Sequence, residues 1–113
     1  MITIQTLQEY GADTATGLAR CMNMEAFYLR LVNTELQDTN FEKLNTAIAT
    51  GDAHAAFDCA HALKGALGNL ALTPMFDPAC TLTEMLRHAD STEGTEEPLK
   101  ELMDAYERLK ALA

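Results

Sequence analysis

Apolar residues recur at three- and four-residue steps along much of the chain, which is the period of an amphipathic helix. One such stretch runs from Met24 to Gln37, with apolar positions at Met24, Phe27, Tyr28, Leu31, Val32 and Leu36. A shorter stretch ends near Gly51, a residue type that often terminates helices, and contains Phe41, Leu44 and Ile48. A third stripe, near the end of the chain, consists of Leu99, Leu102, Met103, Tyr106 and Leu109. We therefore predict a helix in each stretch.

Strand signals are nearly absent, because valine occurs once and no stretch alternates apolar and polar residues for long. The predicted fold class is therefore all-α. Helices of these lengths joined by short turns favour an antiparallel four-helix bundle, with the core bundle at about residues 22–112. One or two short additional N-terminal helices, around residues 3–10 and 12–21, are expected to cover one end. No internal repeat or long linker divides the chain, so residues 1–113 are expected to form a single domain.

Two prolines obscure the start of one further helix, whose apolar face is supplied by Ala79, Leu82 and Leu86. Thr73 followed by Pro74 resembles an N-cap followed by proline in the first helical position, and Asp77 followed by Pro78 gives the same signal. The helix therefore begins either at Pro78, or at Pro74 with a bend at the second proline.

The most informative segment runs from Asp52, a suitable N-cap, to Leu72. Its predicted buried stripe consists of Ala56, Ala60, Leu63, Leu67 and Leu70. At about 100° per residue, His61 projects roughly 140° from the centre of that stripe, so we expect an exposed imidazole. Lys64 lies about one turn further along and is close enough to share a bound anion with His61.

Gly65 and Gly68 lie on the same side of this helix as His61, although each glycine costs about 1 kcal/mol of helix propensity relative to alanine. Nothing in the predicted core demands them. We therefore expect both glycines to give a docking protein or a phosphoryl group clearance beside the ring. Phe57, one turn before His61, is expected either to belong to the docking surface or to lie at the rim of the core.

A neutral imidazole with an ordinary pKa of about 6.5 can attack phosphorus with a ring nitrogen lone pair. Phosphoryl transfer then requires in-line positioning and positive charge near the phosphoryl oxygens, and Lys64 can supply that charge. The chain has no Gly-rich phosphate loop followed by Lys and Ser or Thr. It is therefore predicted not to be an enzyme with its own kinase or nucleotide site.

The segment around this histidine resembles the H-x-L-K-G-S-x-x-N-[LI]-G motif of histidine-containing phosphotransfer (HPt) domains. The matching residues are His61, Leu63, Lys64, Gly65, Asn69 and Leu70, preceded by Ala49, Gly51, Asp52, Cys59 and Ala60, which fit the family's A-x-G-D and [LC]-A-H pattern. With the flanking helices, the likeness covers about residues 15–112. Asn69 is expected to satisfy backbone or helix-end groups.

The resemblance implies that His61 is the phosphoacceptor and Lys64 its electrostatic stabiliser in a two-component phosphorelay. The implied partners are receiver domains of response regulators, a hybrid sensor histidine kinase, or both, with an aspartyl phosphate as the donor and an aspartate of another receiver as the acceptor. No cofactor is expected on this chain, because Mg²⁺ would belong to the receiver. Two departures from the family pattern are Ala66, where serine is common, and Ala71, where glycine is common. Ala71 is expected to add a methyl group at a close packing point.

The charge of the chain narrows the range of partners. Seventeen acidic and eight basic residues give a formal net charge of −9, which opposes binding to nucleic acid or to anionic membrane surfaces. No apolar run approaches the roughly 20 residues of a membrane span, and the start of the chain lacks the features of a secretory signal.

Cys21, Cys59 and Cys80 lack metal-site spacing and are expected to be small buried side chains. We expect a cytoplasmic monomer that works as a free protein, as its native-looking Met1 suggests.

This helix has three other interpretations. A catalytically inactive relative would keep the bundle as a docking module for a receiver or kinase. A metal site is conceivable because His54, Asp58 and His61 lie on one helical face, although the helix offers no fourth ligand. A cysteine hydrolase is disfavoured, since Cys59 and His61 point roughly 200° apart around the helix.

Overall fold

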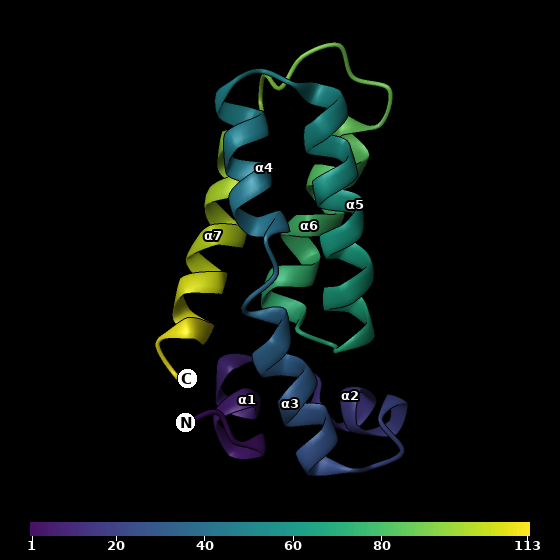
Figure 1. The fold of residues 1–113 in the computed structure, drawn as a ribbon, viewed down its shortest axis with the longest axis vertical. Helices are drawn as coiled ribbons and strands as arrows, with labels where there is room; N and C mark the ends of the chain where they lie inside the picture. The colour runs from purple at the N-terminus through teal and green to yellow at the C-terminus, as the bar shows by residue number, and fades with distance from the viewer.

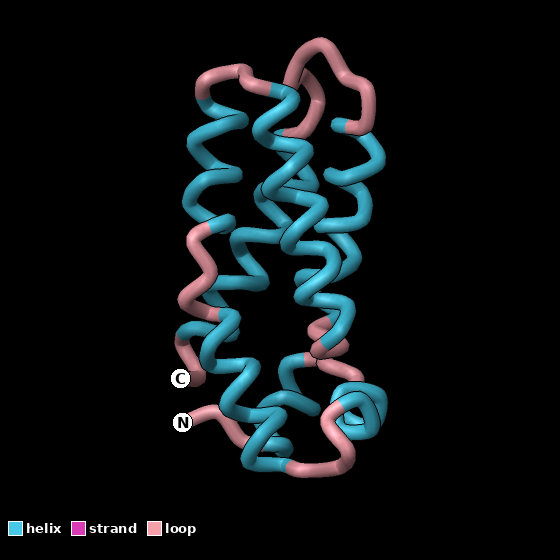
Figure 2. Tube along the Cα trace, turned by 45° about the vertical axis from the view of Figure 1, so that its right-hand side comes forward, coloured by secondary structure: helices cyan, strands magenta, loops and turns pink.

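The computed structural model describes all 113 residues, and its regular secondary structure consists of helices, with no strand. Seven helices follow one another in the chain (Figures 1 and 2): α1 (Ile4–Tyr10), α2 (Thr14–Arg20), α3 (Glu25–Glu35), α4 (Asn40–Ala49), α5 (Ala53–Asn69), α6 (Thr73–Leu86) and α7 (Glu96–Lys110). The expected all-α fold class is confirmed.

The bundle is formed by α4, α5, α6 and α7, which run alternately up and down (Figure 1). Helix α5 packs against both α4 and α6, and α6 packs against α7. Helix α3 continues approximately in line with α4 after a break at residues 36–39, and α1 and α2 cover the end of the molecule beside it. The predicted antiparallel four-helix bundle with short N-terminal additions is therefore the observed architecture.

The turn that leads into α5 contains the helix-ending glycine and the N-cap that the sequence predicts. Gly51 ends α4 with a φ of 77°, a left-handed conformation that glycine adopts without steric cost. The next residue, Asp52, caps α5 by accepting a hydrogen bond of 3.0 Å from the backbone N–H of Ala55. These two residues fix where α5 begins and therefore which side chains it directs outward.

Helix α6 begins before both prolines and continues through the second one. It runs from Thr73 to Leu86 with Leu72 as its N-cap, so Thr73 is the first helical residue and not the cap. Pro78 is buried inside the helix and has no N–H to donate to the carbonyl of Pro74. The interpretation in which α6 begins near Pro74 is the correct one.

The N-terminal helices share the core of the bundle. The buried apolar residues of α1 and of the segments that flank α1 and α2 belong to one continuous cluster with the bundle helices: Ile2, Leu7, Tyr10, Ala12 and Cys21. The Tyr10 hydroxyl donates a hydrogen bond of 2.9 Å to the backbone carbonyl of Ala105 on α7.

No helix in the molecule has both the length and the apolar character needed to span a bilayer.

Candidate functional site

His61 lies on the outer face of α5. Its ring is exposed, whereas the adjacent Ala60 and nearby Leu63 are fully buried. The predicted buried stripe of α5 is confirmed at each of its five positions, Ala56, Ala60, Leu63, Leu67 and Leu70. The predicted outward orientation of the imidazole is confirmed with it. The local reason is the helical period alone, because the stripe docks α5 onto the core and thereby directs His61 to the surface.

An open depression of about 470 Å³ lies beside this ring. Its lining residues are Arg20, His61, Lys64, Gly65, Gly68, Asn69 and Phe76. The structure thus brings four of the predicted site residues together, namely His61, Lys64, Gly65 and Gly68. Phe57 does not line the depression.

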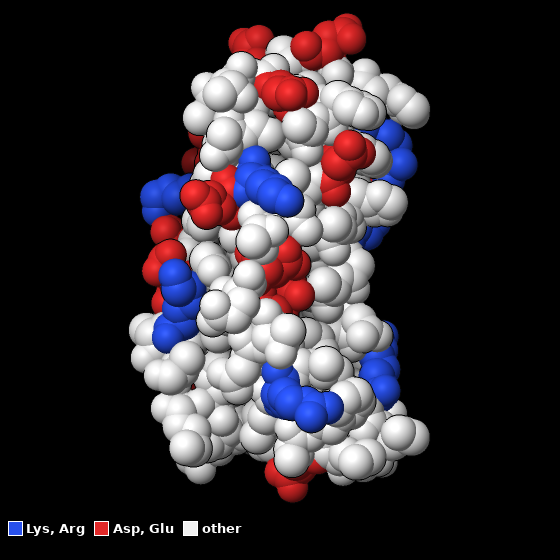
Figure 3. Space-filling view, viewed as in Figure 1, with Lys and Arg blue, Asp and Glu red and all other residues white.

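The two cations of the depression have no carboxylate partner. Neither Lys64 nor Arg20 has an Asp or Glu oxygen within ion-pair distance, and no acidic residue lines the depression. In a protein with 17 acidic residues, this is a local excess of positive charge. Lysine and arginine atoms also mark the right-hand edge of the molecule in Figure 3, over α5 and α2, whereas acidic atoms dominate the top. The depression is therefore suited to bind an anion.

Lys64 also faces helix α6. The pKa of the Cys80 thiol is raised by burial, and the positive charge of Lys64 acts in the opposite direction. The pKa of the Glu84 carboxyl is lowered, mainly by its hydrogen bond and ion pair with Arg87 and to a smaller extent by Lys64. Cys80 is only partly buried, so the expectation that all three cysteines are buried is wrong for this one, while Cys21 and Cys59 are buried as expected.

Arg20 was not found by sequence reasoning. It lies at the end of α2, and its guanidinium Nη1 donates a hydrogen bond to the backbone carbonyl of Gly68, 48 residues further along the chain. No motif or spacing in the sequence connects Arg20 to α5. Phe76, on α6, was missed for the same reason, since only the packing of helices places it there.

The two glycines of the depression differ in their surroundings. A β-carbon at Gly65 would meet no atom within 4 Å, so this position is open to an approaching molecule. A β-carbon at Gly68 would lie 2.7 Å from Cε1 of Phe76, which is closer than real contacts allow. The reasoning that nothing in the fold demands these glycines is therefore wrong for Gly68, because the contact between α5 and α6 uses its lack of a side chain. A docking role for either glycine stays a prediction.

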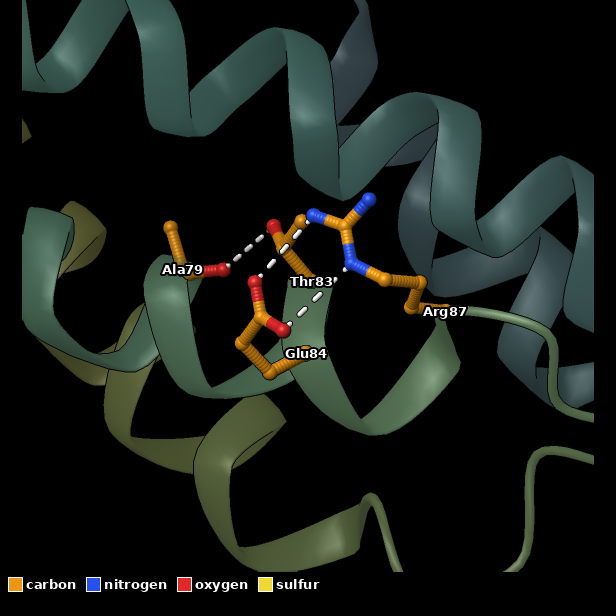
Figure 4. A network of polar contacts seen from close by, with 4 residues as sticks. All are labelled: Ala79, Thr83, Glu84 and Arg87. Atoms are coloured by element: carbon orange, nitrogen blue, oxygen red, sulfur yellow. Dashed lines mark hydrogen bonds and ion pairs between the residues drawn. The ribbon is translucent and has the colours of Figure 1, made fainter.

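Phe57 contacts the ring of His61. The centroids of the Phe57 and His61 rings are 5.5 Å apart with an interplanar angle of 33°. The guanidinium carbon of Arg87 lies 5.2 Å from the Phe57 centroid, and its Nη2 lies 3.1 Å from Oε1 of Glu84 (Figure 4). Phe57 is partly buried and packs against the core cluster. It therefore occupies the rim of the core, and its part in docking stays a prediction.

Ala71, just after the end of α5, stands where the motif has glycine and has a backbone conformation that suits glycine. Ala71 has a φ of 56°, in the left-handed region that favours glycine. We expected the methyl group of Ala71 to crowd a close packing point. The feature that the structure shows at this position is instead a backbone conformation that suits glycine. Asn69 was expected to satisfy helix-end groups, but its side chain makes no hydrogen bond within the protein and lines the depression.

The metal and hydrolase interpretations gain no support from the geometry. His54 Nε2 lies 3.6 Å from Asp58 Oδ2, and no group of three His, Cys, Asp or Glu side chains is placed to hold a metal ion. Cys59 is buried whereas His61 is exposed, so these two side chains point to opposite sides of α5.

Comparisons with known proteins connect this site to a family. The sequence model of the Hpt domain matches residues 28–112. This segment includes the whole of α4 to α7 and most of α3, while α1 and α2 lie outside it. No curated protein and no solved structure gives a significant match to the chain.

Proposed function

Because this chain belongs to the Hpt domain family, whose members are phosphotransfer modules of two-component signalling without kinase activity, we propose that His61 is its phosphoryl acceptor. The observation that carries the proposal is the position of this exposed imidazole at the edge of a depression with two unpaired cations. His61 also stands at the histidine position of the family's H-x-L-K-G motif. In the proposed relay, it accepts a phosphoryl group from an aspartyl phosphate and passes it to another receiver.

The reaction at His61 is a nucleophilic displacement at phosphorus. A ring nitrogen of the neutral imidazole forms the N–P bond, while the P–O bond to the partner's aspartate breaks and its electron pair stays on the carboxylate. The ring is then positively charged, and it becomes neutral when the proton on its other nitrogen passes to solvent. Transfer to the next receiver reverses these changes, with an aspartate oxygen as the nucleophile. The exposed ring allows an in-line approach from solvent.

Lys64 is proposed to stabilise the negative charge on the phosphoryl oxygens. It follows His61 by three residues, lines the same depression and makes no ion pair with a carboxylate. Its charge is therefore available to an anion that reaches the histidine. Gly65, with open space around it, is proposed to provide the clearance through which the partner approaches.

Receiver domains of response regulators, or of a hybrid sensor histidine kinase, are the proposed partners, as is general for Hpt domains. The reacting group of a receiver, an aspartyl phosphate, is anionic and matches the cations of the depression. We expect Mg²⁺ to be supplied by the receiver and assign no cofactor to this chain.

Substitution of the acceptor tests the proposal directly. Wild-type protein and the His61→Gln variant are incubated with a ³²P-labelled receiver domain and, separately, with phosphoramidate, a small phosphoryl donor that needs no partner protein. His54→Gln and His88→Gln are matched controls, because both histidines are also exposed. After incubation with the receiver, we expect acid-labile phosphohistidine in the wild type and in both controls, and none in His61→Gln. The melting temperature of this variant should stay within about 2 °C of wild type because an exposed side chain contributes little packing.

Two results would contradict the proposal. Full phosphorylation of His61→Gln by the receiver would show that another residue is the acceptor. A wild-type protein that binds receivers but takes up no phosphoryl group from either donor would instead be an inactive docking module.

A further inference from the structure

Helix α2 brings an arginine to the site from outside the segment that the family model matches. Arg20 lies in α2, before residue 28, yet it lines the same depression as His61 and Lys64. We infer that Arg20 is a second anion-binding residue of this site and contacts the anionic phosphorylation site of the receiver during transfer. The inference rests on the proposed function of His61 and adds a residue that the family pattern does not contain.

The side chain of Arg20 is held at the rim of the depression. Its Nη1 donates a hydrogen bond to the carbonyl of Gly68, which also accepts a hydrogen bond of 3.1 Å from the N–H of Ala71. A guanidinium has five N–H donors in a fixed plane, so one bond to Gly68 leaves the others for a ligand. Arg20 is exposed and makes no ion pair with a carboxylate. Its guanidinium is thus held in place without a carboxylate in ion-pair contact, although its charge contributes to the lowered pKa of Asp13.

Specific contacts hold α2 against the end of α5. The backbone N–H of Asp13 donates a 3.0 Å hydrogen bond to the carbonyl of Ala71, and Asp13 caps α2 by accepting from the N–H of Thr16. Gly17 lies against the Tyr28 ring, and the Tyr28 hydroxyl donates to the carbonyl of Leu70 at 2.8 Å. Helix α2 is therefore fixed relative to the last turn of α5. The position of Arg20 follows from the fold and not from a free surface side chain.

Local charge matters more here than the net charge of the molecule. At physiological ionic strength, charges further apart than about 8 Å are largely screened from one another. A receiver that reaches His61 therefore encounters the cations at the rim of the depression, although the whole chain carries −9. Two cations from two helices, α2 and α5, can hold an anionic group between them more firmly than Lys64 alone.

A purely structural role is the competing explanation. Helix α5 has no basic residue in its last turn, and Arg20 places a positive charge at the carbonyl end of this helix. Loss of that contact would lower stability without affecting recognition of a partner. The experiment must therefore include a measurement that helix capping alone would not change.

The test compares Arg20→Ala, Arg20→Lys and the control Arg30→Ala in the full chain. Arg30 is exposed on α3, lies over the Phe27 ring and does not line the depression. Its substitution by alanine therefore removes one positive charge at a distance from the site. The second-order rate of phosphoryl transfer from a ³²P-labelled receiver domain is measured as a function of NaCl concentration, together with melting temperature. Phosphorylation by phosphoramidate is measured in parallel as a reaction that needs no docking.

We expect Arg20→Ala to reduce the transfer rate about 5- to 10-fold at 0.1 M NaCl and to weaken its dependence on salt. Arg20→Lys should retain most of the rate, and Arg30→Ala should stay within about twofold of wild type. Phosphorylation by phosphoramidate should persist in all three variants.

The inference is overturned if Arg20→Ala transfers at the rate of Arg30→Ala. It is also overturned if the loss is the same at every salt concentration and only follows the melting temperature, since that is the signature of helix capping. These results are distinct from a failure of the proposed function, in which the wild type itself acquires no phosphoryl group on His61 from either donor.

Discussion

The Phe76 ring of α6 lies directly against the backbone of Gly68 on α5, where a β-carbon would be 2.7 Å from Cε1 of the ring. This contact explains why a residue with poor helix propensity is present inside a long helix. Because Phe76 is only partly buried, its ring can move at some energetic cost. Gly65, one turn earlier, has no such neighbour and forms the natural comparison.

Alanine substitution separates the two glycines. Gly65→Ala is expected to raise the free energy of unfolding by about 0.5–1 kcal/mol, because it improves helix propensity in open space. Gly68→Ala is expected to be less stable than Gly65→Ala by about 1–3 kcal/mol, because Phe76 must be displaced. Urea unfolding measures both values. If the two variants proved equally stable, the packing explanation for Gly68 would be wrong.

Ala71→Gly is expected to stabilise the protein by about 0.5–1 kcal/mol. Ala71 has a φ of 56°, which costs an alanine roughly 1–2 kcal/mol and glycine almost nothing, although the added freedom of glycine in the unfolded chain offsets part of the gain. The control is Ala62→Gly, at an exposed position inside α5, which should destabilise by about 1 kcal/mol. Thermal unfolding of both variants checks the difference in sign, and a loss of stability in both would refute the conformational argument.

Lys64→Ala is expected to slow phosphoryl transfer about 10-fold without abolishing it. The imidazole nucleophile stays in place, but one source of positive charge at the phosphoryl oxygens is lost. Single-turnover transfer from a labelled receiver gives the rate constant. Lys43→Ala, an exposed lysine on α4 outside the depression, should transfer at nearly the wild-type rate. An equal effect of both substitutions would indicate a general charge effect and not a local one.

The pH dependence of stability is predicted to involve Glu35, at the end of α3. Burial, followed by a hydrogen bond and like charge from Asp38, raises the pKa of this carboxyl from 4.5 to about 8, and its Oε2 is buried without a hydrogen-bond partner. Between these two pKa values the folded protein binds more protons than the unfolded chain. The contribution of Glu35 to the free energy of unfolding therefore decreases as pH rises from about 4.5 to about 8 and is level above that range.

Substitution of Glu35 isolates this contribution. Relative to wild type, Glu35→Gln should gain stability progressively between pH 5 and pH 8, by a few degrees in melting temperature, roughly 3 °C at pH 8. The exposed Glu42 provides the control, since Glu42→Gln should show no comparable change with pH. A constant difference between Glu35→Gln and wild type across this range would show that Glu35 is charged at pH 6.

Helical periodicity was sufficient to predict the fold class and the orientation of His61. The buried stripe of α5 follows a simple 3.6-residue repeat, so the outward direction of His61 and Lys64 is a local property of the sequence. Residues that reach the site from other helices have no such signal. Arg20 and Phe76 are placed by the way in which α2 and α6 pack on α5, which depends on tertiary contacts far apart in the sequence.

Two local details of the backbone could not be predicted from the periodicity of apolar residues. The left-handed backbone of Ala71 depends on how the chain turns between α5 and α6, and alanine gives no sequence signal for it. The continuation of α6 through Pro78 is similar, because proline usually ends or kinks a helix and only burial of this residue in the bundle maintains the helical path.

The hydrogen bonds between α2 and the last turn of α5 have a consequence for engineering. A graft of residues 28–112 onto another protein would carry His61 but would omit the donors from Arg20 and Asp13 to the carbonyls of Gly68 and Ala71. It would also uncover the apolar surface that Leu7 and Tyr10 now shield from water. A transplanted segment should therefore include α1 and α2, and one without them would need new polar groups for these carbonyls.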